Sequence, residues 1–481
     1  QAARPPRPPC PTSRVRRSVC GMAERMTREQ RLVLTIAVLG SFVAFLDGTV
    51  VNVALPAIER ELGGGLATQQ WAVDAYLITL GALILVAGAV SDAYGRQLVL
   101  KIGLIGFGVA SVAVALSPDT TFLIVARAVQ GAAGAFLVPS SLALITGTMD
   151  DPLRSRAIGI WTSLTTVAFV LGPLIGGVIV DQWSWRWVFF INVIPIAIAL
   201  WLVARLGMPD ERAPDARVDI LGAVLCTLGL GATVYALIEQ PNLGWSPLIW
   251  VPLVVGILLL IAFVWRQRAT SHPVLPLDMF RSRNFSAGNI ATLFIYAALS
   301  LNVFVVAVYL QQGAGLSATL AGLASLPTTI LVILLSSRTG AMAGRLGPRL
   351  FMTVGPLVMA VGAILLLTVS TDFDYWWQVL PSMLLFGLGL AITVSPLTAA
   401  ILGAADHDRS GIASAVNNAV ARVAGLLVVT ALAAITGGAL DLVGFHRAAI
   451  VTAALLVIGG VVSLVGIRNP QRDTAQPAPA P

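Results

Sequence analysis

The chain has 481 residues, of which 57% are hydrophobic and 11% are charged, with a formal net charge of +7. Soluble globular proteins carry about 25% charged residues, so this composition excludes a soluble multidomain protein. Apolar runs of about 20 residues recur along nearly the whole sequence, which is typical of a membrane protein built from transmembrane α-helices. An outer-membrane barrel is excluded as well, because its strands would alternate apolar and polar residues.

Residue counts exclude several kinds of chemistry. The one lysine, Lys101, follows a leucine, so the chain lacks the Gly-Lys-Ser/Thr of an ATP-binding loop. Three scattered histidines do not form a zinc motif, and three cysteines suggest no disulfide framework. The positive charges lie between apolar segments, where they orient a membrane protein. We therefore expect no metal, no ATP and no nucleic-acid partner, and we do not expect an enzyme.

Fourteen transmembrane helices are predicted. Before them, residues 1–31 form a Pro- and Arg-rich tail, which is no signal peptide because the first apolar run, of about 24 residues, is too long. The longer connection 266–285 is expected to hold a short interfacial helix. The predicted spans are 32–55, 69–90, 98–117, 121–148, 156–180, 187–206, 218–238, 247–265, 286–310, 318–337, 350–370, 376–402, 412–436 and 448–467.

The distribution of lysine and arginine predicts the orientation in the membrane. With the N-terminus placed inside, 25 of the 30 basic residues lie on the inner side and three on the outer side. Such an excess is typical of cytoplasmic loops and ends. We therefore expect a multi-pass protein of the cell (inner) membrane with both termini cytoplasmic.

Ionisable residues within a membrane are costly and usually mark function, and the clear cases inside the predicted spans are four. They are Asp47, Asp74, Arg127 and Arg422. A rise of 1.5 Å per residue puts the first three about 8 to 12 Å from the outer ends of their helices. We expect Asp47 and Asp74 to face Arg127 in one polar cavity and to take part in proton coupling. A structural ion pair that only locks the bundle is the alternative interpretation.

The loop after the second predicted helix, residues 88–96, reads Gly-Ala-Val-Ser-Asp-Ala-Tyr-Gly-Arg. Gly88 would let another helix approach closely, and Gly95 permits a tight turn. Asp92 can favour a helix N-terminus or pair with Arg96. These four residues are the expected gating element of the loop.

Residues 88–96 resemble motif A of the major facilitator superfamily, although Ala93 replaces the usual basic residue. A weaker copy, residues 340–349, lies between the tenth and eleventh predicted helices. Two related loops suggest the internal repeat that is common in transporters. An ordinary basic turn is the alternative for the second copy.

Three further segments resemble the fourteen-helix drug:proton antiporter family of that superfamily. Residues 46–56 look like its helix 1 signature, and residues 127–131 resemble motif B, whose arginine is implicated in proton transfer. Residues 172–177, Gly-Pro-Leu-Ile-Gly-Gly, resemble motif C, which is found in exporters and is largely absent from symporters. Small residues allow tight helix packing there, and proline bends the helix. The motif C residues are Gly172, Pro173, Gly176 and Gly177.

The resemblance covers about residues 32–467. It implies an all-α major facilitator fold, with 14 transmembrane helices in two six-helix bundles plus two inserted central helices. The expected divisions are a disordered basic cytoplasmic tail (1–31), the N-terminal bundle (32–206), a central linker with the inserted helices and an interfacial segment (207–285), the C-terminal bundle (286–467) and a second cytoplasmic tail (468–481).

The resemblance implies a secondary active efflux transporter that exchanges protons for small amphipathic drugs or antibiotics. The proton gradient would supply the energy without any cofactor, and the expected partners are the substrate, protons and the lipid bilayer, with the chain acting as a monomer. A proton symporter for uptake of a small metabolite is the alternative. A membrane-embedded enzyme or sensor is a second alternative, but the sequence offers no candidate nucleophile–base pair or metal cluster for it.

The segment around Asp74 resembles helix 2 of multidrug members, some of which carry an acid there. Asp74 could hold an organic cation together with Trp71, which lies at i−3 on the same helix face. Residues 284–337 contain no charge, so the second acid that some dication exporters carry in helix 10 is missing. The expected substrate-binding residues are Asp74, Trp71, Tyr76, Phe45, Asn52 and Gln130.

Overall fold

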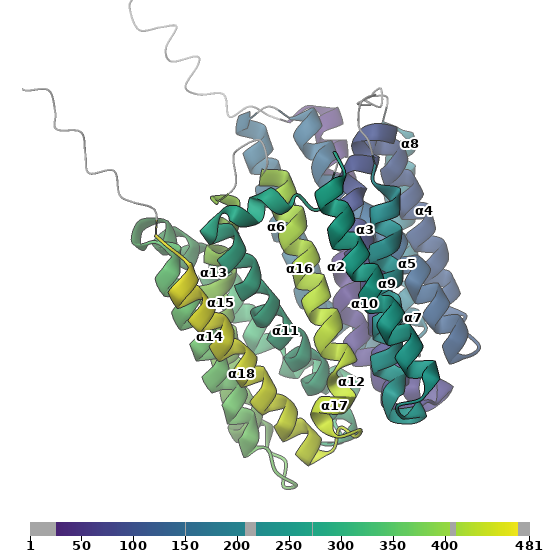
Figure 1. Cartoon of the computed structure of the whole chain (residues 1–481), viewed down its shortest axis with the longest axis vertical. Helices are drawn as coiled ribbons and strands as arrows, with labels where there is room; N and C mark the ends of the chain where they lie inside the picture. The colour runs from purple at the N-terminus through teal and green to yellow at the C-terminus, as the bar shows by residue number, and fades with distance from the viewer. Residues whose placement is uncertain (1–25, 150, 207–217, 272, 405–409, 470–481) are drawn as a thin grey trace, which may run out of the picture.

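The computed structural model describes residues 26–149, 151–206, 218–271, 273–404 and 410–469, and the regular structure in these ranges is helical (Figure 1). A 3-10 helix, η1, spans Leu277–Arg281 within the connection where a short helix is predicted. The α-helices are α2 (Arg28–Leu62), α3 (Gly65–Tyr94), α4 (Arg96–Ala115), α5 (Thr120–Thr148), α6 (Asp151–Gln182), α7 (Trp187–Phe190), α8 (Val193–Ala204), α9 (Ile220–Leu243), α10 (Pro247–Ala269), α11 (Arg283–Gln312), α12 (Ala318–Ala324), α13 (Leu326–Leu346), α14 (Pro348–Leu365), α15 (Leu380–Leu402), α16 (Ser410–Thr430), α17 (Leu432–Thr436) and α18 (Leu442–Gly466).

Within the described ranges, twelve helical segments are long and apolar enough to cross a membrane. Two further helices, α3 and α6, have 30 and 32 residues and pack along α5 and α2. Together these segments account for the fourteen predicted helices in the predicted order.

Three of the predicted spans are interrupted. The sixth breaks at Ile191 and Asn192, between α7 and α8. The tenth span, predicted to end at residue 337, breaks at Ser325 and continues to Leu346. Pro327 stands in the first turn after this break, where its missing N–H costs no helix hydrogen bond. The thirteenth span breaks at Ala431, between α16 and α17. A proline or a glycine can be read from the sequence, but whether it interrupts a span depends on the neighbouring helices.

Helices from the two ends of the chain form two groups that stand side by side, with α2 to α8 in one and α11 to α18 in the other (Figure 1). The groups touch along the pairs α3–α16, α6–α12 and α2–α11. The hairpin of α9 and α10 lies beside them, with α9 packed on α3 and α16. This hairpin is the predicted pair of inserted helices, and the residue boundaries of the halves stay a prediction.

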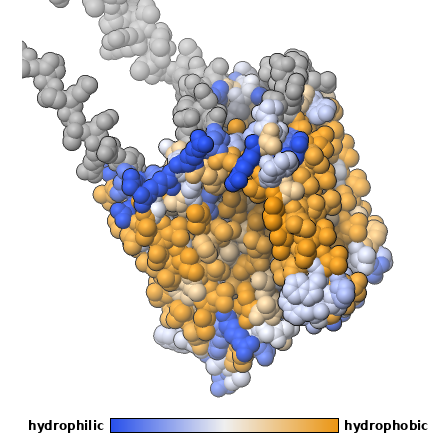
Figure 2. Space-filling model, viewed as in Figure 1, coloured by the Kyte–Doolittle hydropathy of each residue, from blue (hydrophilic) through white to orange (hydrophobic). Residues whose placement is uncertain are grey.

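An apolar surface surrounds the middle of the molecule. Figure 2 shows apolar residues over the central part of the face and polar residues gathered toward its two ends. Helix α10 exposes large aliphatic side chains along its length, among them Leu248, Val251, Leu258 and Ile261. A surface this apolar requires a lipid environment, so the chain is a multi-pass membrane protein.

Candidate functional site

A buried ion pair joins α2 to α5. Arg127 Nη1 donates to Asp47 Oδ2 at 2.7 Å, and the two side chains are 1% and 0% exposed. Arg127 Nε donates to the Ala72 carbonyl of α3 at 2.8 Å, and the guanidinium lies 4.5 Å from the centre of the Tyr76 ring. The arginine therefore connects three helices of the N-terminal group.

Amide side chains complete this network. Gln130 Nε2 and Asn192 Nδ2 donate to Asp47 Oδ1 at 2.9 and 3.0 Å, and Gln130 Oε1 accepts from Arg127 Nη1 at 2.7 Å. Ser111 Oγ of α4 accepts from Gln130 at 2.9 Å. Gln130 was predicted to bind substrate, but it is fully buried against the ion pair. Ser111 was not among the residues expected from the sequence. Its position as a lone polar residue in the apolar half of α4 could have identified it as part of the network.

Asp74 does not share Arg127 with Asp47, so the prediction of two carboxylates on one arginine is wrong. Asp74 Oδ2 accepts from Thr430 Oγ1 of α16 at 2.9 Å, and Asp74 Oδ1 has no hydrogen-bond donor among the described residues. The reason is geometric, because α3 presents the Ala72 carbonyl to Arg127 and turns Asp74 toward the opposite group of helices. A buried carboxyl thus lies at the contact between the two halves.

The predicted partnership of Trp71 with Asp74 is also wrong. Trp71 Nε1 donates to Glu239 of α9 at 2.8 Å, and its ring lies 6.4 Å from that of Tyr235. It therefore faces the inserted hairpin, because residues three apart on a helix differ in direction by about 60° and neighbouring helices separate them. Asn52, another predicted substrate residue, donates to the Gly48 and Thr49 carbonyls of its own helix at 3.4 Å, both long hydrogen bonds.

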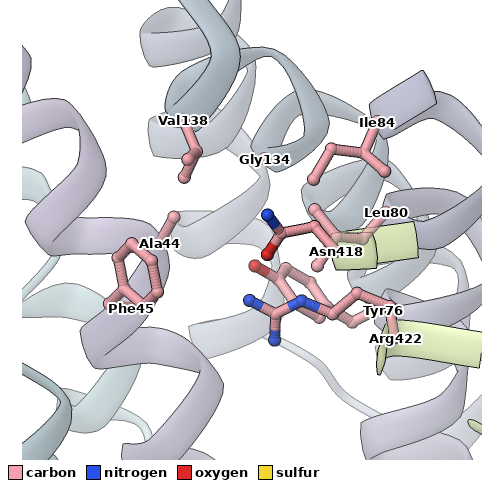
Figure 3. A pocket seen from close by; sticks show the side chains of 9 residues that line it. All are labelled: Ala44, Phe45, Tyr76, Leu80, Ile84, Gly134, Val138, Asn418 and Arg422. Atoms are coloured by element: carbon pink, nitrogen blue, oxygen red, sulfur yellow. The ribbon is translucent and has the colours of Figure 1, made fainter. Parts of the chain in front are cut away.

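Two of the predicted substrate residues, Phe45 and Tyr76, line a cavity between the halves (Figure 3). In this conformation the cavity is narrow, with room for about one water molecule inside its open mouth. Polar groups come from Tyr76 and from Asn418 and Arg422 of α16. The full lining consists of Ala44, Phe45, Tyr76, Leu80, Ile84, Gly134, Val138, Asn418 and Arg422.

The loops that resemble motif A have similar backbone geometry. Gly95 ends α3 with φ +106° and ψ +132°, and Gly347 ends α13 with φ +89° and ψ +152°. Positive φ favours glycine at both places, which is consistent with an internal repeat. The side chain of Asp92 lies outside the described part. Gly88 faces open space, so the close helix contact predicted there is absent from this conformation.

Helix α6 packs closely through the glycines that resemble motif C. Side chains of α2 lie against Gly172 and Gly176, while a Cβ on Gly177 would lie 2.5 Å from the Ala318 carbonyl oxygen of α12. The Pro173 carbonyl in turn packs against Gly322 of α12. These small residues therefore allow α6 to touch both halves at once.

Hydrogen bonds join the two halves at the end of the bundle where α2 ends and α12 begins. Asp181 accepts the backbone N–H groups of Ala318 and Thr319 at 3.0 and 2.8 Å. Gln311 Nε2 donates to the Val53 carbonyl at 3.1 Å. Gln70 Nε2 donates to the Val429 carbonyl at 2.6 Å. We call this end the sealed end.

Comparison with known proteins places this arrangement in a family. The family model of the Major Facilitator Superfamily matches residues 37–221 and 216–429. The methylenomycin A resistance protein of Bacillus subtilis is 34% identical over 413 residues, which is 85% of this chain and 87% of that protein. The puromycin resistance protein pur8 of Streptomyces alboniger is 34% identical over 84% of this chain and 82% of its own length. The tetracenomycin C resistance and export protein of Streptomyces glaucescens is 33% identical over 82% of this chain and 73% of its own length.

Solved structures share the fold at low sequence identity. A peptide transporter POT in complex with sulfate superimposes with a TM-score of 0.69 at 15% identity, covering 90% of this chain and 94% of that one. A D-xylose-proton symporter superimposes with a TM-score of 0.65 at 15% identity, covering 91% of this chain and 98% of that one. With the family match and the resistance proteins above, the conclusion is that the chain belongs to the Major Facilitator Superfamily and is a membrane transporter, not an enzyme.

Proposed function

We propose that the chain exports small amphipathic compounds, drugs or antibiotics among them, in exchange for protons. The observation that carries the proposal is the similarity to proteins named for resistance to methylenomycin A, puromycin and tetracenomycin C, each over at least 82% of this chain. The proton gradient would be the energy source, with no cofactor, and the chain would act as a monomer.

The proposed location is the cell membrane with both termini cytoplasmic, as the excess of basic residues on that side suggests. The sealed end then faces outward. The cavity at Phe45 and Arg422 lies on the cytoplasmic side of the seal, where a compound from the cytosol would enter. The conformation is thus interpreted as the inward-facing state of an exporter.

Asp74 is the proposed switch between proton and substrate. Its carboxyl is buried at the contact between α3 and α16 and receives one hydrogen bond, from Thr430. Among the described residues, no cation is bonded to this carboxyl. Its ionised form would therefore be an unpaired charge inside the membrane, which is costly. Release of its proton into the cytosol would weaken the sealed end and favour opening to the outside.

Asp47 and Arg127 have a different proposed role. Their charges compensate each other, and four hydrogen bonds hold them to Ala72, Gln130 and Asn192. This network fixes α2 and α5 against α3, the helix that carries Asp74 and Tyr76. Proton uptake by Asp47, the other candidate, would have to break the ion pair.

Asp74→Asn and Asp47→Asn separate the two candidates in proteoliposomes. Asn at 74 retains an acceptor for Thr430 but cannot titrate, so export driven by a pH gradient should fail while exchange of labelled for unlabelled substrate persists. Asp47→Asn should impair both, because Arg127 loses its counter-charge. Gradient-driven export at the wild-type rate by Asp74→Asn would refute its role as the switch. If neither the wild type nor the variants export any compound tested, that result would count against the proposed function itself.

A further inference from the structure

Arg422 is held in the middle of the molecule by close packing of α16. A Cβ on Gly81 of α3 would lie 3.5 Å from the Cβ of Arg422. One turn further on, a Cβ on Gly425 would lie 2.7 Å from Ser300 Oγ of α11. Helix α16 thus packs between α3 and α11. The base of the Arg422 side chain is therefore fixed where the two halves meet.

The partly exposed side chain of Arg422 has no carboxylate partner in the part of the chain that the structure describes. Asp47 is paired with Arg127, and Asp74 is bonded to Thr430. Within the described ranges Arg422 forms no ion pair, and the residues that line the cavity include no carboxylate. A guanidinium inside a membrane-spanning bundle is costly unless it meets an opposite charge. The cavity therefore carries a net positive charge that an anion would neutralise.

Polar groups gather around this charge. Figure 3 shows the guanidinium of Arg422 close to the Tyr76 hydroxyl and to the side-chain oxygen of Asn418, which can rotate to present an N–H. Asn418 uses one N–H on the Ser414 carbonyl, at 3.0 Å, and retains a second. The Phe45 ring faces these groups across the cavity, and the remaining lining is aliphatic or glycine. The cavity thus combines a donor-rich end with apolar walls.

We propose that this cavity selects organic anions, meaning a carboxylate or another singly charged oxyanion on an aromatic or apolar body. The oxyanion binds Arg422 with Asn418 and Tyr76 as further donors, and the apolar body lies against Phe45. This inference rests on the proposed export function and names its substrate class. It replaces the cation expected from Asp74, which does not line the cavity.

The test uses the purified full-length protein in nanodiscs of phosphatidylcholine. Three probes share one ring system and differ in charge, namely naphthalene-2-carboxylate, its methyl ester and the 2-naphthyltrimethylammonium cation. Calorimetry should find the carboxylate bound most tightly and the cation most weakly. Arg422→Gln should weaken carboxylate binding about tenfold to a hundredfold, as for loss of a charged hydrogen bond, and change ester binding less than twofold. Arg422→Lys should fall between, because it keeps the charge but loses the planar fork.

Arg268→Gln is the matched control, since it removes one exposed positive charge on α10, away from the cavity lining. It should leave all three affinities unchanged. The inference is overturned if the wild type fails to bind the carboxylate, if the cation binds more tightly, or if Arg422→Gln weakens carboxylate and ester equally. Export is measured separately, with the carboxylate in proteoliposomes. A protein that binds the carboxylate through Arg422 but does not export it would contradict the proposed function and leave the anion site standing.

Discussion

Replacing Asp47 by Asn and Arg127 by Gln, singly and together, tests whether the buried network acts as one electrostatic unit. Asp47→Asn leaves the guanidinium buried with two neutral acceptors, the Ala72 carbonyl and Gln130 Oε1. Arg127→Gln leaves the carboxylate buried with two amide donors, from Gln130 and Asn192. Each single variant thus creates an uncompensated charge, whereas the double variant contains none.

The expected magnitudes follow from burial. Removing one partner of a buried ion pair costs about 3–5 kcal/mol, because the remaining charge stays in a medium of low polarity. The double variant should lose no more than the worse single variant. The coupling energy between the two positions should therefore be on the order of 3 kcal/mol.

The exposed pair of Glu61 and Arg186 is the matched control. Its N–O distance is 2.5 Å, shorter than the 2.7 Å of the buried pair, but its side chains are 49% and 26% exposed. A coupling energy of at most about 1 kcal/mol is expected there because solvent screens the charges. Unfolding of the purified variants in mixed micelles, followed against the mole fraction of denaturing detergent, gives both cycles.

Additive effects at Asp47 and Arg127 would show that the two charges do not stabilise each other. Equal coupling in the two pairs would show that distance, not burial, sets the energy. Either result would refute the reasoning.

Two further predictions concern other parts of the molecule. Gly177→Leu should push α6 away from Ala318 and favour the state open at the sealed end, so a cysteine placed at Thr430 should react faster with a maleimide added outside. Gly159→Leu is the control, because Gly159 lies on the same helix but faces open space, and it should leave the labelling rate unchanged. An unchanged labelling rate in the Gly177 variant would contradict the prediction. Burial raises the pKa of Asp219, but hydrogen bonds from the Gly222 N–H and the α10 side chains outweigh it and hold the pKa below its ordinary value. The stabilisation is therefore present above pH about 4 and is lost as pH falls further through the lower folded pKa. Acid should thus lower the hydrogen-exchange protection factors of α9, which correct for the intrinsic exchange rate at each pH, more in the wild type than in Asp219→Asn. An equal decrease in both would contradict this.

The number and order of the helices could be predicted from the sequence because each span must be apolar and long enough to cross the bilayer by itself. This requirement is local. It also made the few charged residues inside spans conspicuous, so Asp47, Arg127 and Arg422 were noticed before any contact was known. The prediction that Asp47 lies near Arg127 needed only their depths along two helices and opposite charge.

Which helix faces which could not be predicted in the same way. Asp74 and Trp71 lie at suitable depths, but depth says nothing about rotation around the helix axis. That rotation depends on how several helices pack together, as α16 does against both α3 and α11.

The sequence alone therefore determined the membrane fold, its fourteen helices and the identity of the charged residues within them. Only the tertiary structure decided that Asp74 meets Thr430 at the contact between the halves and that Arg422 lines the cavity. The physical reason is that hydrophobic length is a property of one segment, whereas the environment of a buried charge depends on the packing of several helices that are distant in the sequence.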